Sequence, residues 1–353
     1  MLLADLGADV IKIERPGFGD DTRSWGPPWR DGEATYYLST NRNKRSVALD
    51  LADERDLARL REMISGCDVV VENFRPGALD RYGLGYAQLE RAYPRLVYCS
   101  ITGFGSGRGA RLAGYDIIAQ AVGGLMSVTG QPGTEPTKVG VALVDVVTGL
   151  HAAIGIQAAL WHRNETGHGQ LIEVNLLSSL LSALTNQSAA FALTGTVPQA
   201  MGNAHPSVAP YQPLRTADRP LTVAATTDRQ FRLLATVIGR PELADDDRYG
   251  SNACRVNHRL SLVAELESTL QTQPADHWFA LLSEHGVPCG PINDISEAFA
   301  FAEALGLKPL VYPEPDAHGR VIPVVRNPIT LSRTPATYRR SPPELDADTT
   351  ARW

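Results

Sequence analysis

The hydrophobic pattern in the first third of the chain alternates short β-branched runs with helical periodicity. The runs predict strands at residues 10–14, 46–51, 67–72 and 96–102. Between the second and third strands, residues 52–65 place an apolar stripe on one helical face, and residues 87–92 predict another short helix. Strands that alternate with helices are typical of a parallel sheet covered by helices, so this region predicts a doubly wound α/β large domain.

The N-terminal end departs from this pattern. A doubly wound sheet normally begins with a strand and a loop, whereas this chain opens on a helical pattern ahead of residue 10. We therefore expect the first strand of the sheet to be missing. Ligands of such folds bind beyond the carboxyl ends of the strands, where Glu72-Asn-Phe-Arg-Pro-Gly77 and Thr102-Gly-Phe-Gly105 are expected.

The middle of the chain contains an apolar segment, residues 139–145, that ends at Asp145. A helix rich in Gly and Ala is predicted next, at residues 149–160. The turn Gly167-His-Gly-Gln170 then leads to a further strand at residues 171–174.

A change of composition to Pro, Gly, Ala and Asn predicts a linker at residues 198–220. A smaller α+β domain is predicted at 221–304, with helices at 230–238, 259–270 and 275–285. A second linker, 305–309, precedes an extended, proline-rich tail that is long enough to return to the first domain. The large domain is therefore built from residues 1–197 and 310–353.

Charge and cysteine content exclude several classes of protein. The 353 residues contain 33 Lys and Arg against 39 Asp and Glu, a net charge of −6, which argues against general nucleic-acid binding. The 4 cysteines are far apart and lack Cys-x-x-Cys spacing, so we predict neither a zinc site nor a disulfide framework. No His-Glu-x-x-His motif is present, and no metal is predicted.

The chain is predicted to be a cytoplasmic protein without a membrane partner. The stretch at residues 176–193 is apolar but interrupted by Ser, Thr, Asn and Gln, and no apolar run reaches the ~18 residues that a span requires. The first residues carry acids and no basic region, unlike a signal peptide.

Asp145 is the first candidate for chemistry, and two interpretations stay open. The first is a structural role as the N-cap of the Gly- and Ala-rich helix, a position that Asp favours. The other is a covalent nucleophile, because a carboxylate can attack an activated acyl group such as a thioester. Sequence spacing does not distinguish them.

Cations form the second candidate site. Asn41-Arg-Asn-Lys-Arg-Ser46 concentrates three cations in an acidic chain, and Arg15, Arg75 and Arg81 follow other predicted strands. Such charges are usually a solvated face, but several at one sheet edge favour a polyphosphate site. Gly103-Phe-Gly-Ser-Gly-Arg-Gly109 is a weak match to a phosphate loop, because no Gly-Lys-Ser/Thr follows. His205, in Gly202-Asn-Ala-His-Pro206, is either an exposed loop histidine or a base.

Together these segments resemble the family III coenzyme A transferases (the CaiB/BaiF family). The matching stretches run in the family's order through nearly the whole chain: Leu3-Ala-Asp-Leu-Gly-Ala-Asp-Val-Ile-Lys-Ile-Glu-Arg-Pro-Gly17, Asn43-Lys-Arg-Ser46, Val71-Glu-Asn-Phe-Arg-Pro-Gly-Ala-Leu-Asp-Arg81, Gly114-Tyr-Asp116, Asp145, Gly167-His-Gly-Gln170 and Gly286-Val-Pro-Cys-Gly-Pro-Ile-Asn293. Each stretch alone is weak, but jointly they are highly specific.

The resemblance implies an interlocked homodimer. Each subunit has a large Rossmann-like domain and a small domain, and the two linkers that join them thread the partner. It also implies a mechanism. The aspartate at position 145 is acylated by an acyl-CoA donor, the released CoA thiolate then forms an aspartyl thioester, and the acceptor acid takes CoA through a second anhydride. Acyl-CoA is thus a substrate, and no tightly bound cofactor is implied.

The resemblance also assigns binding residues. It implies CoA contacts at Arg15, Leu49, Asn73, Phe74 and Arg81, and an acyl site near Tyr36. A CoA-contacting lysine of the family is replaced here by Ala52, and we expect Lys44 to supply that contact.

Two further alternatives belong to the same resemblance. Racemases of the family use a His where this chain has Tyr115, and a phenol with a reference pKa of about 10 is a poor base at neutral pH, so the transferase is favoured. Gly202, Asn203 and His205 resemble the branch that acts on short dicarboxylic acids such as succinate or glutarate. If the first strand is truly missing, a catalytically weak CoA-binding subunit becomes the alternative.

Overall fold

The computed structural model describes residues 1–316 and 318–351 and has an α/β fold. The chain forms two compact units. The first unit comprises Met1–Ala119, Ala142–Ala183 and Phe301–Trp353, and the second comprises Gln120–Val141 and Leu184–Ala300.

The predicted strands of the first unit are present, but in two separate sheets rather than in one. Strand β1 (Val10–Glu14) pairs in parallel with β4 (Lys44–Ala48). Strands β5 (Val69–Glu72), β6 (Val97–Thr102) and β7 (Leu171–Asn175) form a three-stranded parallel sheet in that order. Among the described residues, no strand pairs with both β1 and β5, so the two sheets are not joined by strand pairing.

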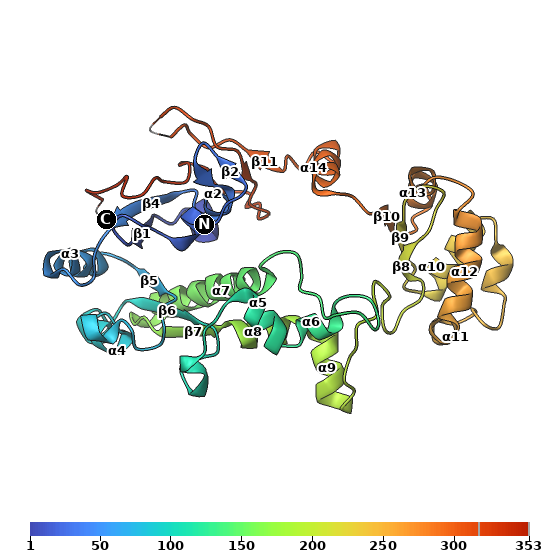
Figure 1. Cartoon of the computed structure of the whole chain (residues 1–353), viewed down its shortest axis with the longest axis horizontal. Helices are drawn as coiled ribbons and strands as arrows, with labels where there is room; N and C mark the ends of the chain where they lie inside the picture. Colours follow the sequence, from blue (N-terminus) through green and yellow to red (C-terminus); the bar gives the residue numbers. More distant parts are fainter. Residues whose placement is uncertain (317, 352–353) are drawn as a thin grey trace. The chain divides into compact units, whose positions relative to one another are not determined.

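The other elements complete the two units (Figure 1). Those at least partly in the first unit are α1 (Leu2–Asp5), η1 (Asp21–Ser24), β2 (Trp29–Arg30), β3 (Glu33–Ala34), α2 (Thr35–Thr40), α3 (Glu54–Ser65), η2 (Asp80–Tyr82), α4 (Tyr86–Ala92), η3 (Arg108–Arg111), α5 (Asp116–Val122), α7 (Leu143–Thr166), α8 (Leu176–Ala183), α14 (Ile295–Ala304), β11 (Leu310–Val311) and β12 (Val324–Val325). Those of the second unit are α6 (Leu125–Val128), α9 (Thr185–Thr194), β8 (Tyr211–Leu214), β9 (Leu221–Ala224), α10 (Asp228–Val237), η4 (Pro241–Ala244), α11 (Asn252–Asn257), α12 (Arg259–Leu270), α13 (Ala275–Glu284) and β10 (Cys289–Pro291).

Helix α7 is the predicted Gly- and Ala-rich helix, extended at both ends. Its buried residues recur every three or four positions, and the helix contacts β6, β7 and α8. Small residues allow a close approach: a Cβ at Gly155 would lie 3.0 Å from Cγ2 of Ile172 in β7. The helix ends at Gly167, whose left-handed backbone places its N–H 2.8 Å from the carbonyl of Arg163.

By length and composition, α7 is also apolar enough to cross a membrane, and 28% of its apolar window is buried. Helices α8 and α9 pass the same test only as a pair bent by 85°. The prediction that no segment reaches this length and hydropathy is therefore wrong for α7, one face of which packs on β6, β7 and α8 of the first unit.

The C-terminal tail returns to the first unit, as predicted. Figure 1 shows the red C-terminal segment beside the blue strands β1 and β4. The carbonyl of Arg340 accepts the N–H of Asn43 at 3.0 Å, and the Asp346 carboxylate accepts the N–H of Ala48 at 2.9 Å. The tail thus satisfies backbone donors of β4 and of the residue before it.

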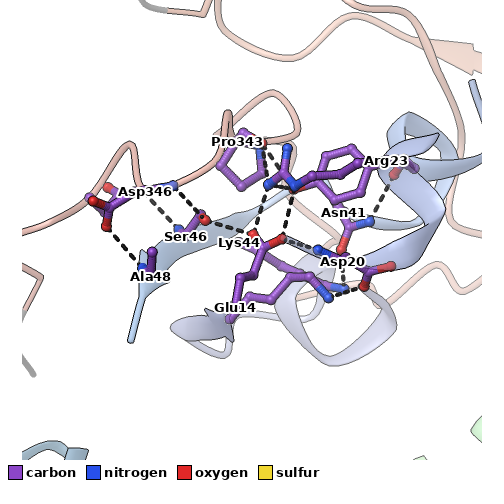
Figure 2. Close-up of polar contacts among 12 residues, drawn as sticks. Glu14, Asp20, Arg23, Asn41, Lys44, Ser46, Ala48, Pro343 and Asp346 are labelled. Carbon is purple, nitrogen blue, oxygen red and sulfur yellow. Dashed lines mark hydrogen bonds and ion pairs between the residues drawn. The ribbon is translucent and has the colours of Figure 1, made fainter. Parts of the chain in front are cut away.

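A buried carboxylate, Glu14, joins the tail region to β1 (Figure 2). Arg23 donates two hydrogen bonds to it, at 2.8 and 2.7 Å, and the hydroxyl of Ser46 donates a third at 2.6 Å. Arg23 also donates to the carbonyl of Pro343 in the tail, at 3.2 Å. Burial alone would raise the pKa of Glu14, but the donors outweigh it and the net pKa is lowered.

The second unit is built on an antiparallel sheet, in the order β10, β9 and β8. The helices predicted at 230–238, 259–270 and 275–285 correspond to α10, α12 and α13. Their apolar faces bury Phe231, Leu262 and Leu282 in one core. This core also encloses Arg255, which donates to the carbonyl of Ala209 at 2.7 Å.

Candidate active site

Asp145 lies in the first turn of α7, not at its N-cap. The N-cap is Ala142, which offers no side-chain hydrogen bond. The capping acceptor comes instead from Asp116, the first residue of α5: its Oδ1 accepts the N–H of Val144 at 2.8 Å and that of Asp145 at 3.2 Å. The N-cap interpretation of Asp145 is therefore wrong, because a residue 29 positions away performs that role and leaves the Asp145 carboxylate available.

The electrostatic setting of Asp145 favours a basic carboxylate. Its side chain reaches the surface, yet neighbouring protein atoms partly desolvate it, and this burial together with the Asp116 carboxylate raises its pKa. The positive end of α7 acts in the opposite direction and is outweighed. Within the described residues, no Lys, Arg or His forms an ion pair with Asp145, so no cation counteracts the raised pKa.

Tyr36, on α2, lies near Asp145. The residue is 41% exposed, and the pKa of its phenol is raised by burial and by the charges of Asp145 and Asp116. The ring packs edge-on against Trp25, with centroids 5.4 Å apart. The structure thus brings the predicted residues Asp145 and Tyr36 together with Asp116. Asp116 was not singled out from the sequence, and only its place at the end of Gly114-Tyr-Asp116 signals it.

Tyr115 precedes Asp116 and is 61% exposed. The backbone beside it crosses the glycine-rich segment: a Cβ added to Gly103 would lie 2.5 Å from Cα of Gly114. Gly103 and Gly114 are therefore needed for close packing of two chain segments. Close packing therefore accounts for Gly103, the first glycine of Gly103–Gly109, and no phosphate-binding role is needed to explain it.

The residues that the family resemblance assigns to CoA binding lie at or beyond the carboxyl ends of the strands. Arg15 follows β1, is exposed and pairs with Asp21 at 2.6 Å. Leu49 follows β4, and its side chain is buried in the core with Val47 and Met63, so only its backbone could contact a ligand.

Beyond β5, Asn73 and Phe74 are exposed, and the N–H of Phe74 donates to Glu72 at 2.7 Å. Arg81, in η2, is exposed and packs over the ring of Tyr82 at 4.6 Å. No hydrogen bond or ion pair within the described chain joins these residues to Asp145.

Lys44 is a partly enclosed residue of β4. Its Nζ donates to Oδ1 of Asn41 at 2.7 Å (Figure 2). Burial and the neighbouring charge of Lys12 lower its pKa to about 8. It therefore carries a positive charge at neutral pH that a phosphate would stabilise.

The other cations of the basic segment have acidic partners. Arg42 is buried and donates to Asp5 at 3.0 and 2.7 Å. Arg45 pairs with Asp9 at 2.5 Å. The predicted triple-cation cluster is therefore mainly structural, and only Lys44 of the three lacks a carboxylate within ion-pair distance among the described residues.

Gly202, Asn203 and His205 lie in the second unit. Gly202 has φ of +63°, and its N–H donates to the carbonyl of Gly130 at 2.9 Å. Nδ1 of His205 accepts the N–H of Ser207 at 3.1 Å, so the neutral ring carries its proton on Nε2. Asn203 is exposed.

The described residues contain no group of three His, Cys, Asp or Glu side chains that could hold a metal ion. What the geometry offers is a basic carboxylate, a phenol beside it and cations after several strands. A comparison with known proteins decides the family. The model of CoA-transferase family III matches residues 1–349.

The chain belongs to CoA-transferase family III. It is 44% identical to the succinate–glutarate CoA-transferase of Agrobacterium fabrum, covering 98% of this chain and 88% of that protein. It is also 44% identical to the succinyl-CoA:glutarate CoA-transferase of Mus musculus, covering 86% and 70%. A solved CaiB/BaiF family protein from Brucella suis superposes with a TM-score of 0.85 at 42% identity, covering 99% of this chain and 92% of that one.

This family III protein is a CoA-transferase enzyme, and acyl-CoA is the kind of substrate that its family uses. The transferase assignment gives the site a chemical context. A carboxylate with a raised pKa is more nucleophilic than an ordinary one, provided that it stays ionised at working pH. Among Asp116 and Asp145, the two carboxylates described at this site, Asp145 is the one whose pKa is raised.

Proposed function

We propose that this enzyme transfers CoA from a donor such as succinyl-CoA to a short dicarboxylic acid such as glutarate, with Asp145 as the nucleophile. The observation that carries the proposal is the Asp145 carboxylate, which has a raised pKa, has no cationic partner among the described residues and lies beside Tyr36. The names of two relatives, which cite succinate or succinyl-CoA together with glutarate, support the substrate class.

The reaction divides into steps that balance. An Asp145 oxygen attacks the thioester carbonyl carbon, the C–S bond breaks, and CoA leaves as a thiolate. The thiolate then attacks the aspartyl carbonyl of the mixed anhydride and releases the donor acid, which leaves an aspartyl-CoA thioester. The acceptor carboxylate attacks this thioester and expels the CoA thiolate, which gives a second mixed anhydride. The thiolate then attacks the acceptor's carbonyl, acceptor-CoA forms, and Asp145 leaves as a free carboxylate. Covalent catalysis retains the thioester's energy through these exchanges.

Recognition of CoA is assigned to the residues after the strands. Arg15, Arg81 and Lys44 provide charges for the phosphates, since charge-assisted hydrogen bonds to phosphate are strong. The exposed side chains of Asn73 and Phe74 suit the pantetheine arm, and Leu49 contributes through its backbone.

Recognition of the acyl group is assigned to Tyr36 and Tyr115, both of the first unit. A separate assignment concerns the Gly202–Asn203–His205 loop of the second unit. The Nε2–H of a neutral His205 is a donor suited to a carboxylate. A dicarboxylic substrate supplies such a group at its second end. This loop therefore provides the proposed preference for dicarboxylic acids.

The second part of the proposal is a homodimer. Helix α7 exposes Leu143, Val146, Leu150, Ile154 and Trp161, spaced as one helical face, while its other face packs on β6 and β7. A helix that is apolar all round is normally buried on all sides. We assign the exposed face to contact with a second copy rather than to lipid, because the same helix is already bound to the sheet of its own unit.

A CoA-exchange assay tests the function. Wild-type enzyme with succinyl-CoA and a panel of acids should form glutaryl-CoA or another short dicarboxylyl-CoA, and Asp145→Ala should form none. Activity restricted to aromatic or carnitine acceptors would overturn the dicarboxylate assignment. Sedimentation at several concentrations tests the dimer: Ile154→Glu should dissociate it, and a wild type that stays monomeric would contradict this part.

A further inference from the structure

The N-terminus of α7 is capped in an unusual way. A helix start leaves its first N–H groups without partners, and the residue before the helix normally supplies an acceptor. Here the acceptor is Asp116, which comes from a different helix. One carboxylate oxygen receives the N–H groups of both Val144 and Asp145, at 2.8 and 3.2 Å.

This arrangement has two physical consequences at once. It fixes the backbone of Asp145, so the start of α7 cannot fray and the carboxylate is held in place. It also positions a second negative charge beside that carboxylate. An uncharged cap such as Ser or Asn would also fix the start of the helix, but it would not add a negative charge beside Asp145.

We propose that Asp116 is a positioning residue that holds the nucleophile at the first turn of α7 and drives its acylation by like-charge repulsion. The inference rests on the proposed role of Asp145. It assigns to Asp116 a part in the reaction that goes beyond capping. Asp116 itself does not need to touch the substrate.

The driving force follows from the charge balance of acylation. Before the step, Asp116 and Asp145 are two carboxylates held close together. When Asp145 attacks the thioester carbonyl, its charge passes to the CoA sulfur as the C–S bond breaks. The mixed anhydride is neutral at Asp145, so the repulsion with Asp116 is relieved and acylation becomes more favourable.

The raised pKa of Asp145, caused by burial and then by Asp116, agrees with this arrangement. Among the described residues, Tyr36 from α2 also faces Asp145; its pKa is raised, so it stays neutral at neutral pH. Among the described residues, no cation forms an ion pair with Asp145 that would cancel the repulsion.

Asp116→Asn separates the two roles. The amide oxygen can still accept both N–H groups, but the charge is gone. We expect the rate of CoA release in a single turnover with succinyl-CoA to fall about three- to tenfold, because without the Asp116 charge the pKa of Asp145 falls and its carboxylate becomes a weaker nucleophile. The KM for succinyl-CoA should not change, and the acid limb of the pH–rate profile should move to lower pH.

The chain offers a matched control. Asp53 caps α3 in the same manner, since its Oδ1 accepts the N–H groups of Arg55 and Asp56 at 2.8 and 3.2 Å. It is exposed and outside the site described above. Asp53→Asn should leave the rate and the pH profile unchanged. Asp53→Ala and Asp116→Ala should each lower the melting temperature by a few degrees through the loss of a cap.

A second readout does not depend on turnover. With ¹³C-labelled aspartate, the Asp145 carboxyl carbon should titrate at lower pH in Asp116→Asn than in wild type. Unchanged titration and unchanged rates, with only the Asp116→Ala stability loss, would show that Asp116 is merely a cap and overturn the inference. A wild type that releases CoA without acylating Asp145 would instead overturn the proposed function and this inference with it, while the titration would still report the coupling.

Discussion

Glu14 and Asp145 are two carboxylates of the first unit that meet opposite environments. Glu14 is buried, receives two hydrogen bonds from Arg23 and one from Ser46, and its pKa is lowered. Asp145 reaches the surface, lies beside another carboxylate and has a raised pKa. The comparison shows that burial alone does not decide the ionisation of a carboxylate. The donors around it decide whether it stabilises the fold or stays reactive.

The largest expected effect comes from removing the cation of the Glu14 network. Arg23→Ala leaves a buried carboxylate without its main donor, which should lower the free energy of unfolding by about 3–5 kcal/mol. Urea denaturation measures it. The control is Arg15→Ala, because the exposed Arg15–Asp21 pair contributes at most about 1 kcal/mol. Equal losses in both variants would contradict the assigned role of Glu14.

The next effect concerns the pH dependence of that network. Because the folded-state pKa of Glu14 is lowered, its contribution is present above the unfolded pKa of about 4.3 and is lost as pH falls through the folded value. Glu14→Gln should therefore destabilise the protein by about 2 kcal/mol at pH ~7 and by less at pH ~3, which is below the unfolded pKa. Parallel denaturation curves at the two pH values measure this difference. A constant difference would exclude ionised Glu14 as the cause.

A smaller effect is expected when a residue assigned to CoA binding is substituted. Arg81→Gln removes a charge assigned to phosphate binding, so the KM for succinyl-CoA should rise about tenfold, or ~1.4 kcal/mol, while kcat stays the same. Steady-state kinetics at two salt concentrations measure the change. A fall in kcat with unchanged KM would place Arg81 in the reaction rather than in binding.

The smallest expected effect is a stabilisation, whereas the substitutions in the Glu14 network destabilise the protein. A folded-state pKa that is raised makes ionised Asp145 unfavourable for folding above its unfolded pKa of about 3.9. Asp145→Asn should therefore stabilise the protein at neutral pH by at most about 0.5 kcal/mol, since solvent screens this exposed group, and the gain should vanish below pH ~4. Thermal unfolding at both pH values provides the measurement. Destabilisation at neutral pH would show that the charge of Asp145 stabilises the fold.

Elements with clear periodicity could be predicted from sequence. Local hydrophobic patterns predict strands β1, β4, β5 and β6 and helix α12. These elements could therefore be predicted without knowledge of the rest of the fold. The division of the strands into two sheets depends on long-range pairing, which no local pattern contains. The predicted domain boundaries at residues 197, 220 and 304 stay predictions.

The candidate site was predictable only in part. The resemblance indicated Asp145 and Tyr36, but their proximity depends on how α2 and α7 pack in the folded unit. The capping of α7 by Asp116 links residues from different helices, so a local motif could not reveal it. Likewise, the basic segment before β4 gave no sign that Arg42 would be buried against Asp5.

The central claim is that the side chain of Asp145 is acylated during transfer. Intact-mass spectrometry after rapid mixing with succinyl-CoA, followed by hydroxylamine trapping and peptide mapping, tests it directly. The adduct should map to Asp145 in wild type and be absent from Asp145→Ala. Glutaryl-CoA formation by an enzyme whose Asp145 is never modified would contradict the account.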